Sequence, residues 1–159
     1  MTPKQVATEL FGAVFGRFDG QAAAELIHSD YIQHNPIIPT GAAPLLGFLP
    51  ALEESGIAAT THRVIGEGDL VVLHNTYADA QAFGAETLVA FDVLRIDGDK
   101  AVEHWDNLQA PPATTASGRS MTEGPTDITD LHLTAENKAL VSSFCWKTCP
   151  SPICRPPKT

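Results

Sequence analysis

The hydrophobic pattern of this chain changes its period once, after Gly56. Before that point apolar residues recur every three or four positions, which is typical of amphipathic helices. From Ala59 to Gln109 apolar and polar residues alternate over long stretches, which is typical of strands with one buried face. Because the helices come first and the strands follow, the pattern predicts an α+β domain with helices packed on one face of a curved antiparallel sheet.

Three helices are predicted before the strands. The first covers residues 2–18 and opens with a Thr-x-x-Gln capping box. The second covers residues 21–27, and an extended segment over 31–36 separates it from the third, over 40–54. Pro50 lies inside the third helix, and we expect it to kink or split that helix because proline removes a backbone donor.

Two hairpins are predicted after the helices, over residues 60–80 and 86–109. The second turns at Asp97-Gly98-Asp99, a strong turn sequence. A three-residue loop there pairs Asp92 with His104 and Ala90 with Asp106. Side chains alternate between faces, so this register places Asp92, His104 and Asp106 together on one face of the sheet.

Two carboxylates beside an imidazole are an arrangement suited to general acid/base catalysis. The alternative is that this face is the solvated side of an antiparallel sheet, where polar residues need no function. Apolar residues share the face, as in small-molecule pockets; they are Leu88, Ala90, Leu94, Val102 and Leu108. The opposite face is also mixed, so periodicity does not choose between the two; it carries Phe91, Val93, Arg95, Glu103 and Trp105.

The remaining motifs give no reason to expect a metal or another cofactor. The chain has no His-x-His pair, no His-Glu-x-x-His helix and no Gly-x-Ser-x-Gly turn. Gly66-Glu67-Gly68 has acidic neighbours, which disfavour a phosphate site. The three cysteines all lie in the last 15 residues, in a spacing that fits zinc poorly.

Charge and length narrow the class of protein. With 159 residues the chain fits one domain, or one domain with a tail. Its formal net charge of -9 disfavours binding to nucleic acid and to anionic membranes. No apolar run approaches the roughly 18 residues that span a bilayer, and the first five residues lack the order of a signal peptide, so we expect a cytoplasmic protein.

The end of the chain differs in composition from the rest. Residues 110–133 are predicted to form a loop or arm, because the stretch 110–129 is rich in Pro, Thr, Ser and Gly and has no apolar period. Residues 134–159 form a C-terminal extension, predicted as a short helix followed by an irregular tail rich in Cys and Pro. Two interpretations stay open for it: a truncated second repeat of the domain, or an arm that crosses to a second subunit.

Three stretches together resemble a known family: YIQHNP at Tyr31, HRVIGEGDLVVLHNTY at His62 and AFDVLRIDGDKAVEHWDNLQ at Ala90. They are similar to the SnoaL-like polyketide cyclases of the nuclear transport factor 2-like superfamily, over residues 2–133. The resemblance implies a cone-shaped fold, in which a strongly bent antiparallel sheet wraps a long N-terminal helix and two shorter ones around a deep pocket. It also implies dimers and cofactor-free aldol chemistry with an Asp as acid/base. Other members isomerise, dehydrate, hydrolyse epoxides or only bind.

The resemblance carries over to particular residues. Asp106 matches the acid/base position, and Asp92 and His104 match pocket positions, so these three are the candidate catalytic residues. The candidate substrate-binding residues are Tyr31, His34, Asn35, His74 and Leu94.

Three functions follow as hypotheses, in order of preference. The first is a cofactor-independent lyase or isomerase acting on a small, largely apolar carbonyl compound. The second is a non-catalytic module that binds a small ligand in the same pocket. The third is an epoxide hydrolase, which needs an Asp-Arg-Asp cluster; Arg95 is predicted on the face opposite Asp92, which leaves Arg63 as the candidate.

The outer face of the sheet carries a prediction of its own. If Asp92 faces the pocket, Phe91, Val93 and Trp105 face outward, where they need cover. We expect a second subunit to provide it in a homodimer.

Overall fold

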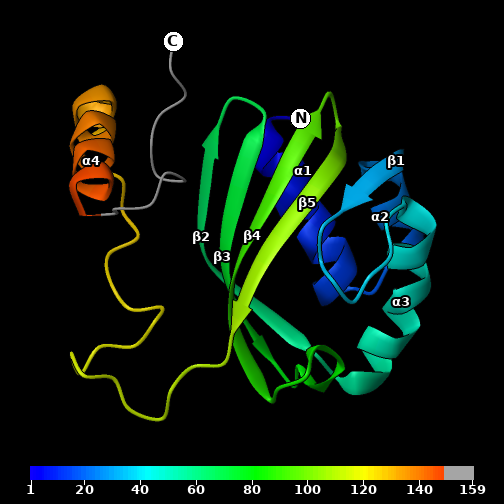
Figure 1. Cartoon of the computed structure of the whole chain (residues 1–159). Helices are drawn as coiled ribbons and strands as arrows, with labels where there is room; N and C mark the ends of the chain where they lie inside the picture. The colour runs from blue at the N-terminus through cyan, green and yellow to red at the C-terminus, as the bar shows by residue number, and fades with distance from the viewer. Residues whose placement is uncertain (149–159) are drawn as a thin grey trace. The chain divides into compact units, whose positions relative to one another are not determined.

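The structure, a computed structural model, describes residues 1–148 of the chain (Figure 1). Its elements, in chain order, are α1 (Pro3–Phe11), the π-helical turn η1 (Gly12–Gly16), α2 (Gly20–Leu26), β1 (Ile27–Gln33), α3 (Ala42–Ser55), β2 (Ala58–Glu67), β3 (Leu70–Ala78), the 3-10 turn η2 (Gln81–Phe83), β4 (Thr87–Asp97), β5 (Lys100–Gln109), the 3-10 turn η3 (Leu131–Leu133) and α4 (Thr134–Thr148). No helix within this described part is both long and apolar enough to cross a bilayer.

The five strands form one curved sheet in the order β1-β5-β4-β3-β2. Strands β2 to β5 pair antiparallel with their chain neighbours, whereas β1 joins the edge parallel to β5. Figure 1 shows α1 behind the strands, with α2 and α3 beside β1. The α+β fold is therefore confirmed, and the first three residues of the segment predicted only as extended, 31–33, belong to strand β1.

The first helix changes its hydrogen bonding halfway along. The capping box at Thr2 is present, as predicted. After Phe11 the helix widens to η1, in which the Arg17 amide donates to the Gly12 carbonyl at 3.0 Å. Phe18 then adopts a φ of 50°, in the left-handed region that is uncommon for residues other than glycine. The predicted single helix to Phe18 is thus two pieces with different geometry.

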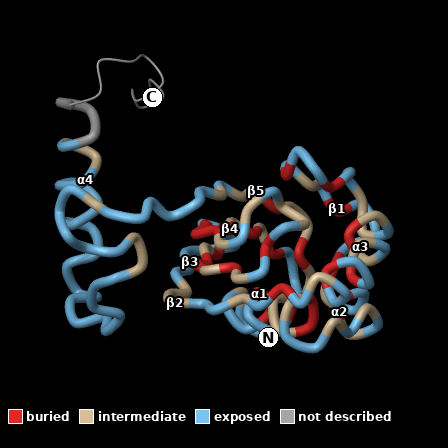
Figure 2. Tube along the Cα trace, turned by 90° about the horizontal axis from the view of Figure 1, so that it is seen from below, coloured by how far each residue is buried: buried red, intermediate tan, exposed pale blue. Residues whose placement is uncertain are grey.

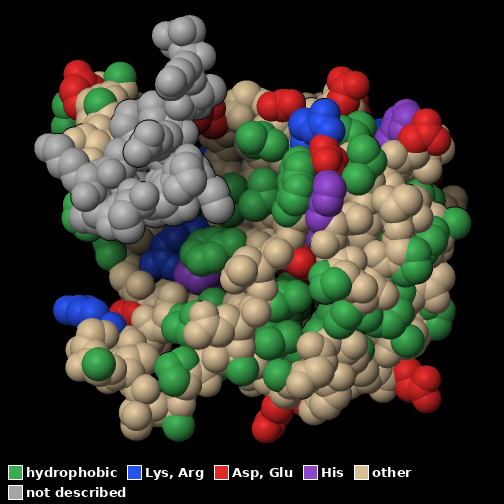
Figure 3. Space-filling model, in the orientation of Figure 1, with side chains coloured by type: hydrophobic (Ala, Val, Ile, Leu, Met, Phe, Trp, Pro, Cys, Tyr) green, Lys and Arg blue, Asp and Glu red, His purple; other side chains and the backbone are tan. Residues whose placement is uncertain are grey.

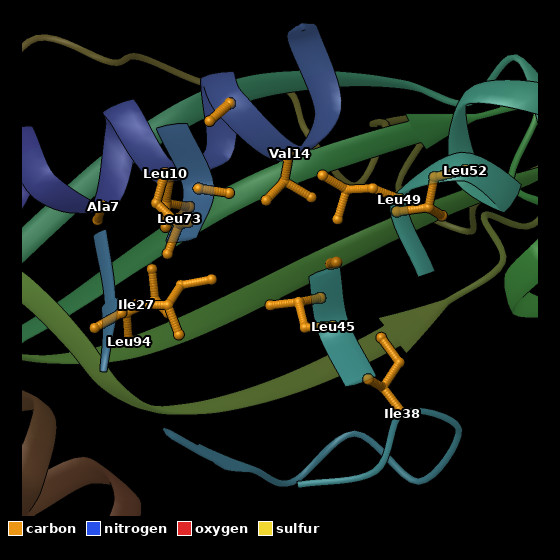
Figure 4. Close-up of a cluster of buried hydrophobic side chains, with 14 of the residues drawn as sticks. Ala7, Leu10, Val14, Ile27, Ile38, Leu45, Leu49, Leu52, Leu73 and Leu94 are labelled. Carbon is orange, nitrogen blue, oxygen red and sulfur yellow. The ribbon is translucent and has the colours of Figure 1, made fainter. Parts of the chain in front are cut away.

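The core lies between the helices and the inner face of the sheet. Figure 2 shows the buried stretches of α1, β3 and β4 next to each other. In Figure 4 the aliphatic side chains of α1 point toward those of α3 and the strands. Leu52, Leu73, Leu94, Val6 and Val71 are completely enclosed. Because these side chains come from every layer, the packing fixes how the helices sit across the sheet.

Helix α3 departs from the prediction at its start. Thr40 does not cap it; Gly41 occupies the N-cap position, and the Thr40 hydroxyl accepts the Gln33 amide at 2.9 Å instead. The helix continues through Pro50 without being split, and it ends at Gly56 with a left-handed φ of 73°. The bond from Thr40 links the start of α3 to the end of β1.

The β4–β5 hairpin also departs from the predicted register. Asp97 pairs with Lys100, so the turn has two residues instead of three. Val102 is an extra residue in β5, a bulge between the pairs Ile96–Ala101 and Arg95–Glu103. Beyond the bulge Asp92 lies opposite Asp106, and His104 lies opposite Leu94. Val102 therefore does not belong to the apolar inner wall predicted for it; it lines a surface cleft with His28 and Asp97.

Contacts divide the chain into two units, Met1–Gly124 and Pro125–Thr159. In the second, the described residues form η3 and α4, and most of their side chains are exposed. Of the stretch 110–133 predicted as a loop or arm, the described residues 110–130 contain no helix or strand, and the last three form η3. The short helix predicted at the start of the extension is α4, which runs to Thr148. The rest of the irregular tail predicted there lies outside the described residues.

Candidate active site

A cavity of about 50 Å³ lies between the inner face of the sheet and the first helix. Its walls are mainly apolar, with a few polar groups that converge from β1, β3, β4 and β5. The lining residues are Leu10, Phe11, Val14, Phe15, Tyr31, Gln33, Asn35, Ile38, Leu45, Tyr77, Phe83, Asp92, Leu94, His104, Asp106 and Leu108. Small-molecule pockets are typically built in this way.

Asp92 is the most enclosed acidic group of the cavity, with 3% of its surface exposed. Its Oδ2 accepts hydrogen bonds from the Asn75 amide at 2.7 Å and from the Tyr77 hydroxyl at 2.9 Å. The Thr61 hydroxyl donates to the Asn75 carbonyl oxygen at 2.7 Å, which turns the amide nitrogen toward Asp92. The carboxylate is therefore held from β3 by two donors, as a buried charge requires.

His104 is held in a defined orientation by Gln33. The Gln33 Oε1 accepts the backbone amide of Asn35 at 3.0 Å, and His104 Nδ1 lies 2.8 Å from the same oxygen. Because Oε1 is an acceptor, Nδ1 carries the proton and donates. Nε2 then points at Asp92 Oδ1, 3.3 Å away. His104 and Asp92 therefore lie side by side at the cavity, close enough for a hydrogen bond between Nε2 and Oδ1.

Asp106 is positioned by Asn35. The Asn35 Oδ1 accepts the backbone amide of Ile37 at 2.8 Å, so the amide nitrogen is directed at Asp106 Oδ2, to which it donates in a short hydrogen bond. The other carboxylate oxygen has no hydrogen-bond partner among the described residues. Asp106 is only half-buried, and it lies at the cavity beside the His104–Asp92 pair.

Two tyrosines complete the polar side of the cavity. Burial raises the pKa of Tyr31 well above its ordinary value, and the negative charges of Asp106 and Asp92 raise it further. Burial, with the charge of Asp92, raises the pKa of Tyr77 in the same direction. Both hydroxyls therefore stay protonated in the working range of pH and act as hydrogen-bond donors.

Two predicted binding residues lie outside the cavity. Along β1, Tyr31 and Gln33 face inward, so His34 faces outward; it stacks on Trp105 with ring centroids 5.0 Å apart and contacts Glu103. Along β3, Asn75 and Tyr77 face inward, so His74 lies on the outer face. The placement of both histidines in the pocket was wrong, because the strand alternation assigns them to the other side.

On the outer face His74 belongs to a small cluster. Its ring stacks on Phe91 with centroids 4.5 Å apart, and its Nδ1 accepts a hydrogen bond from Arg63 at 3.1 Å. Arg63 also donates to the backbone carbonyls of Thr122 and Gly124. Arg95 pairs with Glu103 on the same side. No arginine among the described residues lines the cavity, so the Asp-Arg-Asp cluster of an epoxide hydrolase is not assembled there.

The three candidate catalytic residues could also hold a cation. One ligand atom from each of Asp92, His104 and Asp106 lies within 4.8 Å of the others. Nε2 is the histidine atom available for this, because Nδ1 bonds Gln33. A divalent cation would replace the bond between His104 and Asp92, so the protein's own hydrogen bonds compete with it.

The structure brings together six of the eight predicted site residues; their roles in binding and catalysis stay predictions. It adds Gln33, Asn75 and Tyr77, which were not predicted. Asn75 could have been found: it follows Val71 and Leu73 on an apolar strand face, and a polar residue on such a face is the informative exception.

Comparison with known proteins bears on the fold and the family. No curated protein matches this chain in sequence. Solved structures do match it in fold. IdmH from Streptomyces antibioticus, a proposed polyketide cyclase, superposes with a TM-score of 0.53 at 19% identity, over 68% of this chain and 92% of its own.

Two further solved structures agree. AclR from Streptomyces galilaeus, a proposed hydroxylase, gives a TM-score of 0.54 at 18% identity, over 67% of this chain and 88% of its own. A cystatin-fold protein from Novosphingobium aromaticivorans gives a TM-score of 0.59 at 16% identity, over 67% of this chain and 98% of its own. At these identities the likeness shows the fold alone.

The sequence profile of the SnoaL-like domain matches residues 7–104, more than half of the chain. This stretch contains Tyr31, Asp92 and His104 and ends two residues before Asp106. It confirms the resemblance seen in the sequence motifs. The chain belongs to the SnoaL-like domain family.

Proposed function

We propose that the protein is a cofactor-independent lyase or isomerase that removes a proton next to the carbonyl group of a small, largely apolar compound. The observation that supports this most is the setting of Asp106. Asn35 fixes one of its oxygens, and the other lies at an apolar cavity beside the His104–Asp92 pair. A fixed carboxylate in such a setting suits a general base.

The proposed step begins with the substrate carbonyl next to His104. Asp106 takes a proton from the neighbouring carbon; the C–H bond breaks, an O–H bond forms on Asp106, and the electron pair moves onto the carbonyl oxygen as an enolate. In its doubly protonated form His104 donates to that oxygen from Nε2, in place of its contact with Asp92 Oδ1, while the Asp92 carboxylate balances the charge of the ring. Asp106 then returns the proton to another carbon in an isomerisation, or the enolate carbon attacks a second carbonyl in an aldol reaction.

Proton exchange into a simple ketone tests the step. In D₂O, NMR of 2-butanone with the wild-type protein should show loss of the hydrogens next to the carbonyl. Asp106→Asn should lower this rate about 100-fold or more, the scale expected of a general base. Asn keeps an oxygen for the bond from Asn35, so the variant should fold. The same assay with EDTA should give an unchanged rate, because no metal is proposed.

The matched control is Asp97→Asn, which removes an exposed carboxylate at the hairpin tip. Its exchange rate should equal that of the wild type. An Asp106→Asn protein that exchanges as fast as the wild type would remove Asp106 from the mechanism.

The second candidate is a binding module without catalysis. It is favoured by the hydrogen bonds that Asp92 and His104 already make within the protein, since such a network also serves to satisfy buried polar groups. A ketone that binds in the cavity without any Asp106-dependent exchange would favour this function over the first. In both cases we propose a cytoplasmic protein with a small-molecule ligand.

A further inference from the structure

A second pocket lies behind the wall of the first. It measures about 190 Å³ and sits between the α1–η1 segment and β2, lined by Thr8, Phe11, Gly12, Phe15, Gly16, Ala59 and Thr61. Phe11 and Phe15 line both this pocket and the 50 Å³ cavity. The two rings, with centroids 5.4 Å apart, are therefore the partition between the two spaces.

The backbone that carries the partition is irregular. Phe11 directly precedes η1 and Phe15 belongs to it. Such π-helical turns are often found at functional sites. Phe18, just after the turn, has a φ of 50°, a conformation that costs free energy for a residue other than glycine. Phe15 contacts Phe11 and Tyr77 through its ring alone, with centroids 5.4 and 5.0 Å apart. Turning this ring breaks no hydrogen bond.

The inner cavity alone is too small for an aromatic ring. A cavity that binds benzene measures about 150 Å³, whereas the space beside Asp106 measures about 50 Å³. That space can take a carbonyl group and its nearest carbons. Any larger apolar part of a substrate needs further room, and the pocket behind Phe11 and Phe15 is adjacent and lined mainly by apolar atoms and small residues.

We infer that the pocket along Gly12–Gly16 is a second binding subsite, which holds the apolar body of a ketone whose carbonyl lies beside Asp106 and His104. Phe15 is the specificity-determining residue: its ring turns aside to join the two spaces. This inference rests on the proposed function for the position of the carbonyl, and it adds a substrate class, methyl ketones with an apolar body of one or two rings.

Two ketones with the same acetyl head separate the subsites. 2-Butanone has no ring body to place in the pocket along Gly12–Gly16, whereas 2-acetylnaphthalene needs both spaces. NMR titration of the wild type should show tighter binding of 2-acetylnaphthalene, because more apolar surface leaves water. Gly16→Met places a side chain in this pocket, at a position where a Cβ meets nothing within 4 Å. The variant should weaken the binding of 2-acetylnaphthalene at least tenfold and leave the affinity for 2-butanone unchanged. Phe15→Ala should strengthen the binding of 2-acetylnaphthalene severalfold, because the Phe15 ring no longer has to turn aside.

The control is Phe48→Ala, which truncates another half-buried phenylalanine that lines neither space. It should leave the ratio of the two affinities unchanged, and circular dichroism checks that each variant is folded. A Gly16→Met protein that binds both ketones as the wild type does, or loses both equally, overturns the inference; so does a wild type that does not bind 2-acetylnaphthalene. The readout is binding, so the result is independent of whether Asp106 exchanges protons.

Discussion

At the scale of single residues, two side-chain amides organise the candidate site. A backbone donor fixes the side-chain oxygen of Gln33 and of Asn35, and this decides which atom each amide presents to its partner: Gln33 presents the same oxygen, and Asn35 presents its nitrogen. Gln33 accepts from His104, and Asn35 donates to Asp106. Both amides come from the segment at the end of β1, which therefore decides how two groups on β5 are oriented. Their role is positioning, in which a group acts through another.

A second residue-scale feature is the outer-face histidine. Burial lowers the pKa of His74, and the positive charges of Arg63 and His62 lower it further. In the unfolded chain the group titrates near its ordinary value of about 6.5. As the pH falls below that value, the unfolded state takes up a proton that the folded state resists, so the free energy of unfolding decreases between about pH 7 and pH 5.

His74→Phe should reduce the dependence of the free energy of unfolding on pH, because phenylalanine keeps a ring against Phe91 and does not titrate. Urea unfolding at pH 7, 6 and 5 measures the slope of stability against pH in each protein. The exposed His28 gives the control: His28→Gln should keep the wild-type slope. Identical slopes for His74→Phe and the wild type would show that His74 does not contribute to the acid sensitivity.

At the scale of the elements, two errors in the predicted β4–β5 hairpin together leave each side chain on its predicted face. The turn is one residue shorter than predicted, and the bulge at Val102 adds one residue to β5. Together they move the pairing by two positions, which preserves the face of every side chain beyond the bulge. Asp92, His104 and Asp106 thus share a face as predicted, although their cross-strand partners differ. The bulge has no sequence pattern that would have revealed it.

Other parts of the fold depended on packing that sequence does not show. Composition and the hydrophobic period were sufficient to predict the helices, the four antiparallel strands and the α+β class. The parallel pairing of β1 with β5 was not predictable, because it depends on where the chain is brought by helices α1 and α2. The π-helical turn was missed for a similar reason: Phe11, Val14 and Phe15 fit the spacing of an ordinary helix.

Helix α3 offers a matched pair of glycines. Gly56 ends the helix at a left-handed φ, whereas Gly47 lies inside it with open space around its Cβ position. Gly56→Ala should destabilise the protein by about 1 kcal/mol, since alanine is strained there. Gly47→Ala should stabilise it by about 0.5–1 kcal/mol through helix propensity. Urea unfolding at pH 7 checks both; shifts of the same sign would contradict the cap assigned to Gly56.

At the scale of the whole molecule, the outer face of the sheet is the surface at which we propose a second subunit. In Figure 1 the strands lie in front of α1, so Figure 3 views this face, and it shows hydrophobic side chains exposed over β4 and β5. Phe91 is 49% exposed there, next to the half-buried Val93 and Trp105. Large aromatic residues concentrate in the centres of interfaces, which supports the proposed homodimer across this face.

Light scattering after size exclusion tests the dimer. The wild-type chain at micromolar concentration should have twice the chain mass of 16.9 kDa. Phe91→Glu should yield the monomer mass, because a charge cannot be buried in a symmetric apolar contact without a partner. Leu140→Glu on the exposed face of α4 should remain a dimer, as should a chain that ends at Leu133. A monomer mass for the wild type would remove the homodimer and leave the outer face unexplained.

The parallel pairing of β1 with β5 also has a consequence for folding. The hairpins close over two-residue turns, whereas the bonds from Gln33 to His104 and from Asn35 to Asp106 each join residues 71 positions apart. Closing so long a loop costs more chain entropy, so we expect the antiparallel meander to form first and β1 to dock last. A chain that has released β1 keeps most of its sheet but has no oriented Asp106 or His104. Local unfolding at this edge would therefore end the proposed chemistry before the fold is lost.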